Sequence, residues 1–271
     1  MGFNMNYFGL TTTTKDVLKK IEQAEKEERF SEHLDPIDYT NCYPVDKNFP
    51  YIPSGKLLIK QKLQCFFIVN PFSWLVNCFI LKTKVTGYEN IKNVKNAVIT
   101  CNHVNKLDAL VVRYAMRDHD MKIMVGDFNN QKGKLGDYMR AYGIMPFSTD
   151  RNALKNFNQA VSYYLKKKTY VLFFPERSEW WCYEKPRPLM DGAFHYAVKN
   201  NVPVIPTFIT FTKTGKYDAN GIETRKFHVN ILKPIYPQRD LSDHKNIVKM
   251  KEQNSLEWKE SYEEFYGKIL E

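Results

Sequence analysis

A histidine and a carboxylate stand five positions apart, just after an apolar, β-rich run of the chain. The run is AVITC (97–101), and it leads into His103 and then Asp108. In one continuous helix this spacing would turn the two side chains roughly 140° away from each other, so they can meet only if the helix begins after His103. Asn105 is a good N-cap residue with Asp108 three positions later, which favours such a start. A neutral imidazole held by a carboxylate is suited to removing a proton from a hydroxyl that attacks an acyl carbonyl.

The spacing alone also fits a solvated loop histidine beside a favourable charge at a helix N-terminus. The surrounding residues are more specific, because N-H-V-N-K-L-D (102–108) resembles the N-H-x-x-x-x-D signature of the glycerophospholipid acyltransferase family, which includes the lysophosphatidic acid acyltransferases. The resemblance implies an acyltransferase with His103 as its base and Asp108 as the orienting acid. Three further blocks follow in that family's order within roughly residues 85 to 235: GIMPF (143–147) leading to Asp150-Arg151, FFPE (173–176) and VPVIPT (202–207).

Two charged residues of the later blocks are candidates for the site. The resemblance implies that Arg151 binds the acceptor's phosphate, and its planar set of donors suits a phosphate, although an arginine before a helix is also an ordinary surface residue. Glu176 ends a strand of apolar and aromatic residues. A carboxylate there either faces the cleft as a catalytic group or forms a structural salt bridge with a basic neighbour. The sequence leaves these two roles of Glu176 open.

The third block departs from the family pattern E-G-T-R-S. After Glu176 the chain reads R-S-E-W-W, so Arg177 replaces the glycine and Glu179 stands where the family has its arginine. The family's phosphate site therefore cannot simply be copied. We expect substrate to be bound by Arg151 together with four residues in or after this block: Arg177, Ser178, Lys185 and Arg187. The neighbouring aromatic residues either line a pocket for a bulky or glycosylated acceptor or pack beneath the cleft: Trp180, Trp181 and Tyr183.

From residue 96 onward, short β-rich runs alternate with helical stretches. This alternation predicts the α/β class, with a mostly parallel central sheet flanked by helices. Ligands of such sheets bind at the carboxyl ends of strands, which is where His103 stands. We expect an N-terminal amphipathic or interfacial helical segment at residues 1–84 and the acyltransferase catalytic domain at residues 85–271. Strands are expected at 97–101, 122–126, 144–147, 170–174, 202–211 and 226–232, and helices at about 134–142, 152–168 and 192–200.

One aromatic-rich run, Cys65–Leu81, has lysines on both sides. Aromatic rings suit the headgroup level of a bilayer and lysines meet anionic lipid, so the run predicts an interfacial, membrane-associating helix; a buried core helix fits it equally well. Polar residues and Pro71 interrupt the run, which is too short and broken for a confident membrane span of about 20 residues. The net charge of +10 favours an anionic membrane surface as a partner. No nucleic acid is expected, because the lysines are spread over many segments.

Composition and missing motifs narrow the remaining possibilities. The five cysteines are odd in number and contain no C-x-x-C pair, so neither a disulfide framework nor a thiolate zinc site is indicated, and a reducing, cytoplasm-facing location follows. Met1–Leu10 lacks the basic and apolar stretches of a secretory signal. The chain has no G-x-S-x-G, Walker A or H-E-x-x-H motif. A covalent route through Cys101 is disfavoured, because a cysteine at a strand end is usually buried and unreactive.

We therefore expect a peripheral or monotopic membrane protein on the cytoplasmic face that transfers a fatty acyl group directly. The acceptor is the hydroxyl of a 1-acylglycerol-3-phosphate-like lysophospholipid, or, as the altered third block allows, a glycolipid. The acyl donor is acyl-CoA, an acyl carrier protein or an acyl phosphate, with no metal and no bound cofactor, and backbone N–H groups at the helix start stabilise the oxyanion. A non-catalytic binder of anionic lipid is the alternative from another class, and His103 with Asp108 argues against it.

Overall fold

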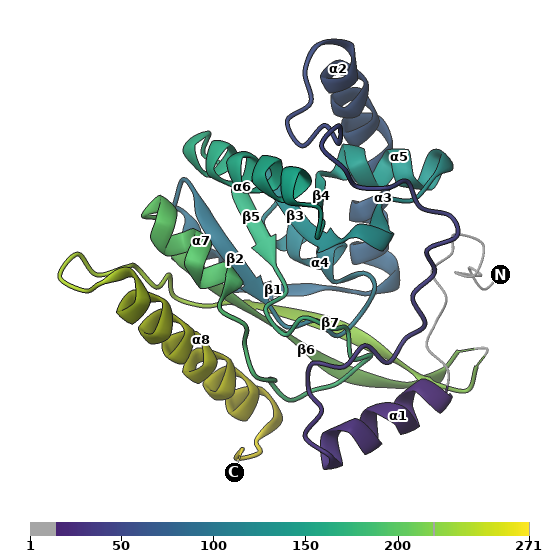
Figure 1. Ribbon diagram of the computed structural model, residues 1–271. Helices are drawn as coiled ribbons and strands as arrows, with labels where there is room; N and C mark the ends of the chain where they lie inside the picture. The colour runs from purple at the N-terminus through teal and green to yellow at the C-terminus, as the bar shows by residue number, and fades with distance from the viewer. Residues whose placement is uncertain (1–14, 219, 271) are drawn as a thin grey trace.

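The chain forms one mixed sheet of seven strands with helices on both faces (Figure 1). This computed structural model describes residues 15–218 and 220–270, so the expectation about Met1–Leu10 lies outside the described residues. The strand order is β1-β7-β6-β2-β5-β3-β4. The strands are β1 (Lys84–Thr86), β2 (Ala97–Cys101), β3 (Met121–Gly126), β4 (Ile144–Phe147), β5 (Tyr170–Phe173), β6 (Val204–Tyr217) and β7 (Glu223–Ile231).

Most of the sheet is parallel, which confirms the predicted class. Strands β6, β2, β5, β3 and β4 run in one direction, while β7 is antiparallel to β6 and pairs in parallel with the short β1. Every residue of β2 is buried, as expected for a central strand that is covered on both faces. Because parallel strands end at the same edge, the residues that follow β2, β5, β3 and β4 all lie along one edge of the sheet.

The two faces of the sheet are covered by different helices. Successive residues of a strand point to opposite faces. Ile99 accordingly packs in a cluster with α4, and Val98 in another cluster with α6, α7 and α8, which lie along the same face in Figure 1. The sequence pattern predicts neither β1 nor α8. The α-helices are α1 (Lys15–Lys26), α2 (Gly55–Gln64), α3 (Asn70–Leu75), α4 (Asp108–Ala115), α5 (Gly133–Tyr142), α6 (Arg151–Lys166), α7 (Gly192–Asn200) and α8 (Asp243–Tyr266).

The residues before the sheet are packed onto the rest of the domain. Helix α1 lies in a buried cluster that includes Trp180, far along the chain. Further on, the Tyr51 hydroxyl donates to the carbonyl oxygen of Pro146 (2.7 Å), and the Ser148 hydroxyl donates to that of Val45 (2.7 Å). The sheet begins at Lys84, and the described residues before it share their packing with the residues that follow.

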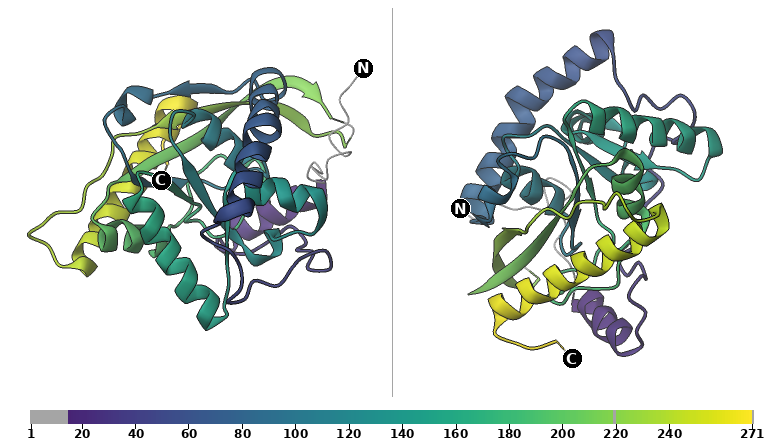
Figure 2. Two further views of the ribbon diagram at one scale, coloured as in Figure 1. Left: turned by 90° about the horizontal axis from the view of Figure 1, so that it is seen from above. Right: turned by 90° about the vertical axis from the view of Figure 1, so that its left-hand side faces the viewer.

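Residues Gly55–Ile80 form one continuous helix of 26 residues that projects beyond the sheet and its covering helices (Figure 2). It joins α2 and α3 through two π-helical turns, Cys65–Val69 (η2) and Val76–Ile80 (η3). Pro71 has no N–H and its ring crowds the carbonyl four positions earlier, so the turn before it widens. The apolar helix is longer than the run that the sequence pattern singles out. By length and composition alone it could cross a membrane, a test that core helices of soluble proteins also pass.

Little of this helix is buried. In its most apolar 18-residue window, 22% of the residues are buried. Large apolar side chains stand in solvent instead: Phe66 and Phe67 are each 68% exposed, Phe79 is 65% exposed and Trp74 is 51% exposed. Contiguous exposed apolar surface of this kind marks an interaction site in a soluble protein. The low burial therefore does not match a buried core helix.

Candidate active site at the carboxyl edge of the sheet

Strand β2 brings His103 to the carboxyl edge of the sheet. Directly after the strand, the buried Asn102 side chain makes two hydrogen bonds with the backbone of Ile209 on β6: its Nδ2 donates to the carbonyl oxygen (2.9 Å), and its Oδ1 accepts from the N–H (2.7 Å). The N–H of His103 then donates to Oε2 of Glu176, which follows β5 (2.9 Å). Groups from both neighbouring strands thus fix the backbone that carries the imidazole.

A turn joins His103 to Asp108 and lets the two side chains meet. His103 Nδ1 lies 3.0 Å from Asp108 Oδ2, and this oxygen also accepts from the N–H groups of Val104 (2.6 Å) and Asn105 (2.9 Å). Helix α4 begins at Asp108 with Leu107 as its N-cap, two residues later than a cap at Asn105 predicts. Asn105 closes the turn instead, because its Oδ1 accepts from the Leu107 N–H (3.0 Å).

Burial sets the protonation of this pair. The imidazole keeps 25% of its side-chain surface exposed and the carboxylate of Asp108 keeps none. Burial lowers the pKa of His103, which favours the neutral ring at pH 7. Burial also raises the pKa of Asp108, and the N–H groups of Asn105 and Val104 oppose that rise by donating to the carboxylate. With Nδ1 engaged and the ring stacked on Phe174 at 4.2 Å between centroids, Nε2 is the nitrogen that can take up a proton.

Glu176 and Arg187 form a buried ion pair beneath the imidazole. Their side chains are 1% and 0% exposed, and Arg187 Nη2 donates to Glu176 Oε2 (2.7 Å). Arg187 also donates to the His103 carbonyl oxygen (3.2 Å) and to the hydroxyl of Ser178 (3.0 Å), which is itself buried. This geometry corresponds to the structural salt bridge that the sequence left open for Glu176. Glu176, Ser178 and Arg187 are buried, and Glu176 and Arg187 bond directly to the backbone of His103.

The other predicted substrate-binding cations differ in their surroundings. Lys185 pairs with Glu25 of α1 at 2.6 Å, so its charge is already compensated. Arg151 is the exposed first residue of α6, after an Asp150 side chain that caps the helix by accepting from Ala153. Arg177 is also exposed, in the turn after β5. Since β4 and β5 end at the same edge as β2, Arg151 and Arg177 lie on the side of the sheet where His103 stands.

The backbone N–H groups at the start of α4 are already engaged. Those of Val104 and Asn105 donate to Asp108, that of Leu107 donates to the side chain of Asn105, and that of Asp108 donates to the Asn105 carbonyl (2.9 Å). The sequence predicts that N–H groups at the helix start stabilise an oxyanion. In the structure these four N–H groups are bonded within the protein.

The aromatic residues of the third block pack rather than line a pocket. Trp180 is fully buried in the cluster that holds α1, its ring lies under the guanidinium of Arg187 (4.7 Å to the ring centroid), and its Nε1 donates to the carbonyl oxygen of Glu32 (3.0 Å). Tyr183 lies in the same cluster and Trp181 packs against it. For Trp180 the packing alternative thus describes the structure.

Sequence reasoning missed the segment 30–35, which these contacts bring beside the site. The carbonyl oxygen of Phe30 accepts from Arg187 (3.0 Å), and Asp35 lies 3.4 Å from the ammonium of Lys106. Between them, His33 is exposed. Partial enclosure lowers the pKa of His33, and the positive charge of Arg177 lowers it further. No motif or periodicity marks this segment, because its place is set by packing of α1 against residues far along the chain.

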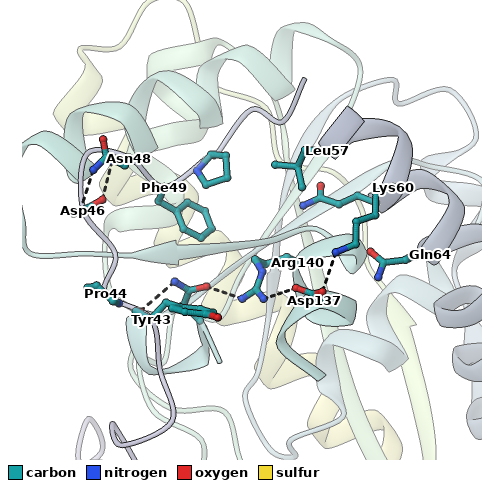
Figure 3. A pocket seen from close by; sticks show the side chains of 13 residues that line it. Tyr43, Pro44, Asp46, Asn48, Phe49, Leu57, Lys60, Gln64, Asp137 and Arg140 are labelled. Carbon is teal, nitrogen blue, oxygen red and sulfur yellow. Dashed lines mark hydrogen bonds and ion pairs between the residues drawn. The ribbon is translucent and has the colours of Figure 1, made fainter. Parts of the chain in front are cut away.

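A separate cavity of about 360 Å³ lies between the segment 43–50, α2 and α5 (Figure 3). Its walls are largely apolar, with Phe49 and Leu57 facing each other across it, and its polar part is a chain of charges in which Lys60 and Arg140 both bond to Asp137. None of the predicted site residues lines this cavity. We therefore do not assign it to the reaction.

Comparison with known proteins places the chain among acyltransferases. Residues 82–210 match the family model described as Acyltransferase, a region that contains His103, Asp108, Arg151 and Glu176. A 1-acyl-sn-glycerol-3-phosphate acyltransferase of Saccharomyces cerevisiae is 26% identical over 184 residues, which make up 66% of this chain and 60% of the relative. The chain thus spans less than two thirds of the length of that curated relative. Both matches agree with the family to which the sequence blocks point.

A solved structure supports the fold in the same way. The crystal structure of the 1-acyl-sn-glycerophosphate acyltransferase of Thermotoga maritima superposes with a TM-score of 0.54, covering 79% of this chain and 95% of that one at 16% sequence identity. At this identity the likeness shows the fold alone. It agrees with the mostly parallel sheet and its covering helices.

Proposed function

Residues 82–210 match the Acyltransferase family model, and from this premise we propose that the chain transfers a fatty acyl group to the hydroxyl of a lysophospholipid. The names of the two relatives support an acceptor of the 1-acylglycerol-3-phosphate type. The donor is an acyl thioester, carried by coenzyme A or an acyl carrier protein, or an acyl phosphate. The scheme requires neither a metal nor a bound organic cofactor, because the imidazole of His103 supplies the base.

In the proposed reaction the acceptor's hydroxyl oxygen attacks the carbonyl carbon of the donor while Nε2 of His103 takes the hydroxyl proton. The tetrahedral adduct then loses thiolate or phosphate, and the imidazolium returns its proton to the leaving group. Asp108 fixes the tautomer and stabilises the imidazolium, because its carboxylate accepts from Nδ1. Direct transfer is supported by the state of Cys101, which is fully buried and whose thiol pKa is raised well above its usual range by that burial.

The observation that carries this proposal is the 3.0 Å contact between His103 Nδ1 and Asp108 Oδ2. The contact is made by a turn in which the N–H groups of Val104 and Asn105 donate to the carboxylate, and the buried pair of Glu176 and Arg187 holds the backbone of His103. So many interactions converging on one partly exposed imidazole serve to orient a base. A lipid binder without catalysis has no need of such an arrangement.

We also propose that the protein works at a membrane, on its cytoplasmic face, as a peripheral or monotopic protein. The exposed apolar side chains of the helix Gly55–Ile80 support this location, and lysines flank its aromatic part. The net charge of +10 adds an attraction to anionic lipid. Attachment there would keep the enzyme where its lipid acceptor is found.

Transfer of label tests the activity directly. Purified protein is incubated with a labelled acyl thioester or acyl phosphate and with a lysophospholipid in vesicles, and the product is identified by mass spectrometry. The wild type should form the diacyl lipid, and His103→Ala should lose about 10²–10⁴-fold in rate, as expected for removal of a general base. Circular dichroism of the variant controls for folding. Full activity of a folded His103→Ala protein would rule out the mechanism, and a wild type inactive with every donor would rule out the function.

A further inference from the structure

Glu179 lies beside the catalytic imidazole and has no role in the reaction as proposed. Its two neighbours in the chain hold it there: the Trp180 N–H donates to the carbonyl oxygen of His103 (2.9 Å), and the Ser178 carbonyl oxygen accepts from Arg187 Nη2 (2.5 Å). Burial is the main effect on the His103 pKa and lowers it, and the negative charge of Glu179 is the largest effect in the opposite direction. A carboxylate therefore stands next to the base where a substrate must bind.

One oxygen of this carboxylate is enclosed and has no hydrogen-bond partner. Among the residues that the structure describes, none donates to Glu179 Oε1. Burial raises the pKa of Glu179 to about 7, with Asp108 and Asp35 adding to that rise and His103 and Lys106 opposing it. An unsatisfied buried acceptor is uncommon in proteins and calls for an explanation. A bound group that donated a hydrogen bond to Oε1 would satisfy it.

The charge of Glu179 restricts what that group can be. A phosphomonoester carries about −1.5 to −2 charges at pH 7 and is repelled by a carboxylate. A phosphodiester carries a single negative charge, and the headgroup beyond it often bears hydroxyl groups that can donate hydrogen bonds. Arg177, exposed two residues before Glu179, is a cation within reach of such a phosphate. The position is also one where the resembling family has an arginine, so the charge here is reversed.

We propose that Glu179 selects the acceptor: a lysophospholipid whose phosphate is a diester with a hydroxylated headgroup is preferred over a phosphomonoester. A headgroup hydroxyl donates to the carboxylate of the partly exposed Glu179, and the diester phosphate lies toward Arg177. The inference rests on the acyl transfer proposed above and narrows its acceptor. It makes Glu179 a specificity-determining residue, distinct from the base and its orienting acid.

The test compares two acceptors that share one acyl chain and one reacting hydroxyl: lysophosphatidylglycerol, a diester, and lysophosphatidic acid, a monoester. The measured quantity is the ratio of their kcat/KM values, diester over monoester. The wild type should favour the diester, and Glu179→Gln should lower the ratio about tenfold or more, mainly by raising kcat/KM for the monoester, because a repulsive charge is removed. Glu179→Arg should lower it further.

The matched control is Glu184→Gln, five residues later in the same segment, where the carboxylate pairs with Arg225 instead. This variant should keep the wild-type ratio. If Glu179→Gln keeps that ratio as well, or slows both acceptors equally, the residue acts through the base or the fold and the inference is wrong. If no acceptor is acylated, the proposed function fails first. Competition of the two lysolipids with a fluorescent lysolipid still tests Glu179 then, and equal affinities in wild type and Glu179→Gln overturn its role.

The pH dependence of the ratio gives a second readout. The pKa of Glu179 is raised to about 7, so the residue is mostly neutral below this pH and mostly charged above it. In the wild type the diester preference should therefore grow as the pH rises through about 7. In Glu179→Gln the pH dependence of the ratio should come only from the second ionisation of the monoester phosphate, near about pH 6. Titration of His103 affects the rates with both acceptors equally and cancels in the ratio. Lys106, Asp35 and Asp108 also face Glu179, and they are present in both the wild type and Glu179→Gln.

Discussion

Replacing Asp108 with asparagine isolates the contribution of one negative charge. Two backbone N–H groups, of Val104 and Asn105, point at Oδ2, so the amide must present its oxygen there and its NH2 in the place of Oδ1. That place is buried, and no described residue bonds to Oδ1. The amide oxygen can then still accept from Nδ1 of His103. The tautomer of the imidazole is thus preserved in Asp108→Asn, while the charge that stabilises the imidazolium is lost.

The size of the loss follows from the separation of the charges. Nδ1 and Oδ2 are 3.0 Å apart, which puts the charge centres of the ring and the carboxylate at about 4 Å, where an ion pair is worth about 4 kcal/mol at an effective dielectric constant of about 20. A transition state weakened by that amount slows the reaction about 10³-fold. We expect kcat to fall by about this factor and both KM values to stay within about threefold, because the carboxylate touches the base and not the substrate.

The assay is the initial rate of labelled acyl transfer at saturating donor and acceptor, with thermal unfolding followed in parallel. Asp191→Asn is the matched control, since Asp191 pairs with Lys251 on the surface at 2.6 Å. It should leave kcat unchanged. A folded Asp108→Asn protein with more than about one tenth of the wild-type kcat would refute the argument that the imidazolium needs this carboxylate.

Three further outcomes are expected. Changing four exposed side chains to serine should release the protein from vesicles without unfolding it: Phe66, Phe67, Trp74 and Phe79. Complete release of the wild type by about 1 M salt would instead show that the attachment is electrostatic. Arg151→Ala should raise the KM of the acceptor and leave that of the donor unchanged, and a change only in the donor KM would contradict its assignment. Arg187→Ala should cost about 3–5 kcal/mol of stability in denaturant unfolding, because it strands the buried Glu176, whereas Lys185→Ala at the surface should cost less than about 1 kcal/mol.

The parallel strands could be predicted because they are short, apolar and buried on both faces, so each of them stands out from its neighbours. β1 escaped this reasoning because it has three residues at the edge of the sheet. α8 left a signal that the reasoning did not use: its buried Met250, Asn254, Trp258 and Tyr262 recur every fourth residue, as one face of a helix requires. Three of these positions are polar or aromatic rather than aliphatic, which hides the stripe in a mostly charged segment.

The site divides in the same way into local and distant parts. His103 and Asp108 meet through one turn, so their spacing and the N-cap residue between them were enough to predict the contact. Glu176 pairs with Arg187 because the chain folds back after the third block. The sequence does not show this turn, so it leaves the salt bridge of Glu176 as one of two alternatives. The place of residues 30–35 depends on α1 packing against Trp180, a contact between distant parts of the chain that carries no local pattern.

Fewer cations are free to bind a substrate in the structure than the sequence predicts. Arg187 pairs with Glu176 and Lys185 pairs with Glu25, so the charges of both are compensated. Of the cations predicted to bind substrate, Arg151 and Arg177 are exposed. Arg177 has a φ of +73°, a left-handed conformation that costs a non-glycine residue about 1 kcal/mol or more. Glycine, which the resembling family has at this position, would avoid that cost. A strained position that carries a charged, exposed side chain at the edge of the sheet where His103 stands is better explained by contact with substrate than by packing, since the side chain buries little.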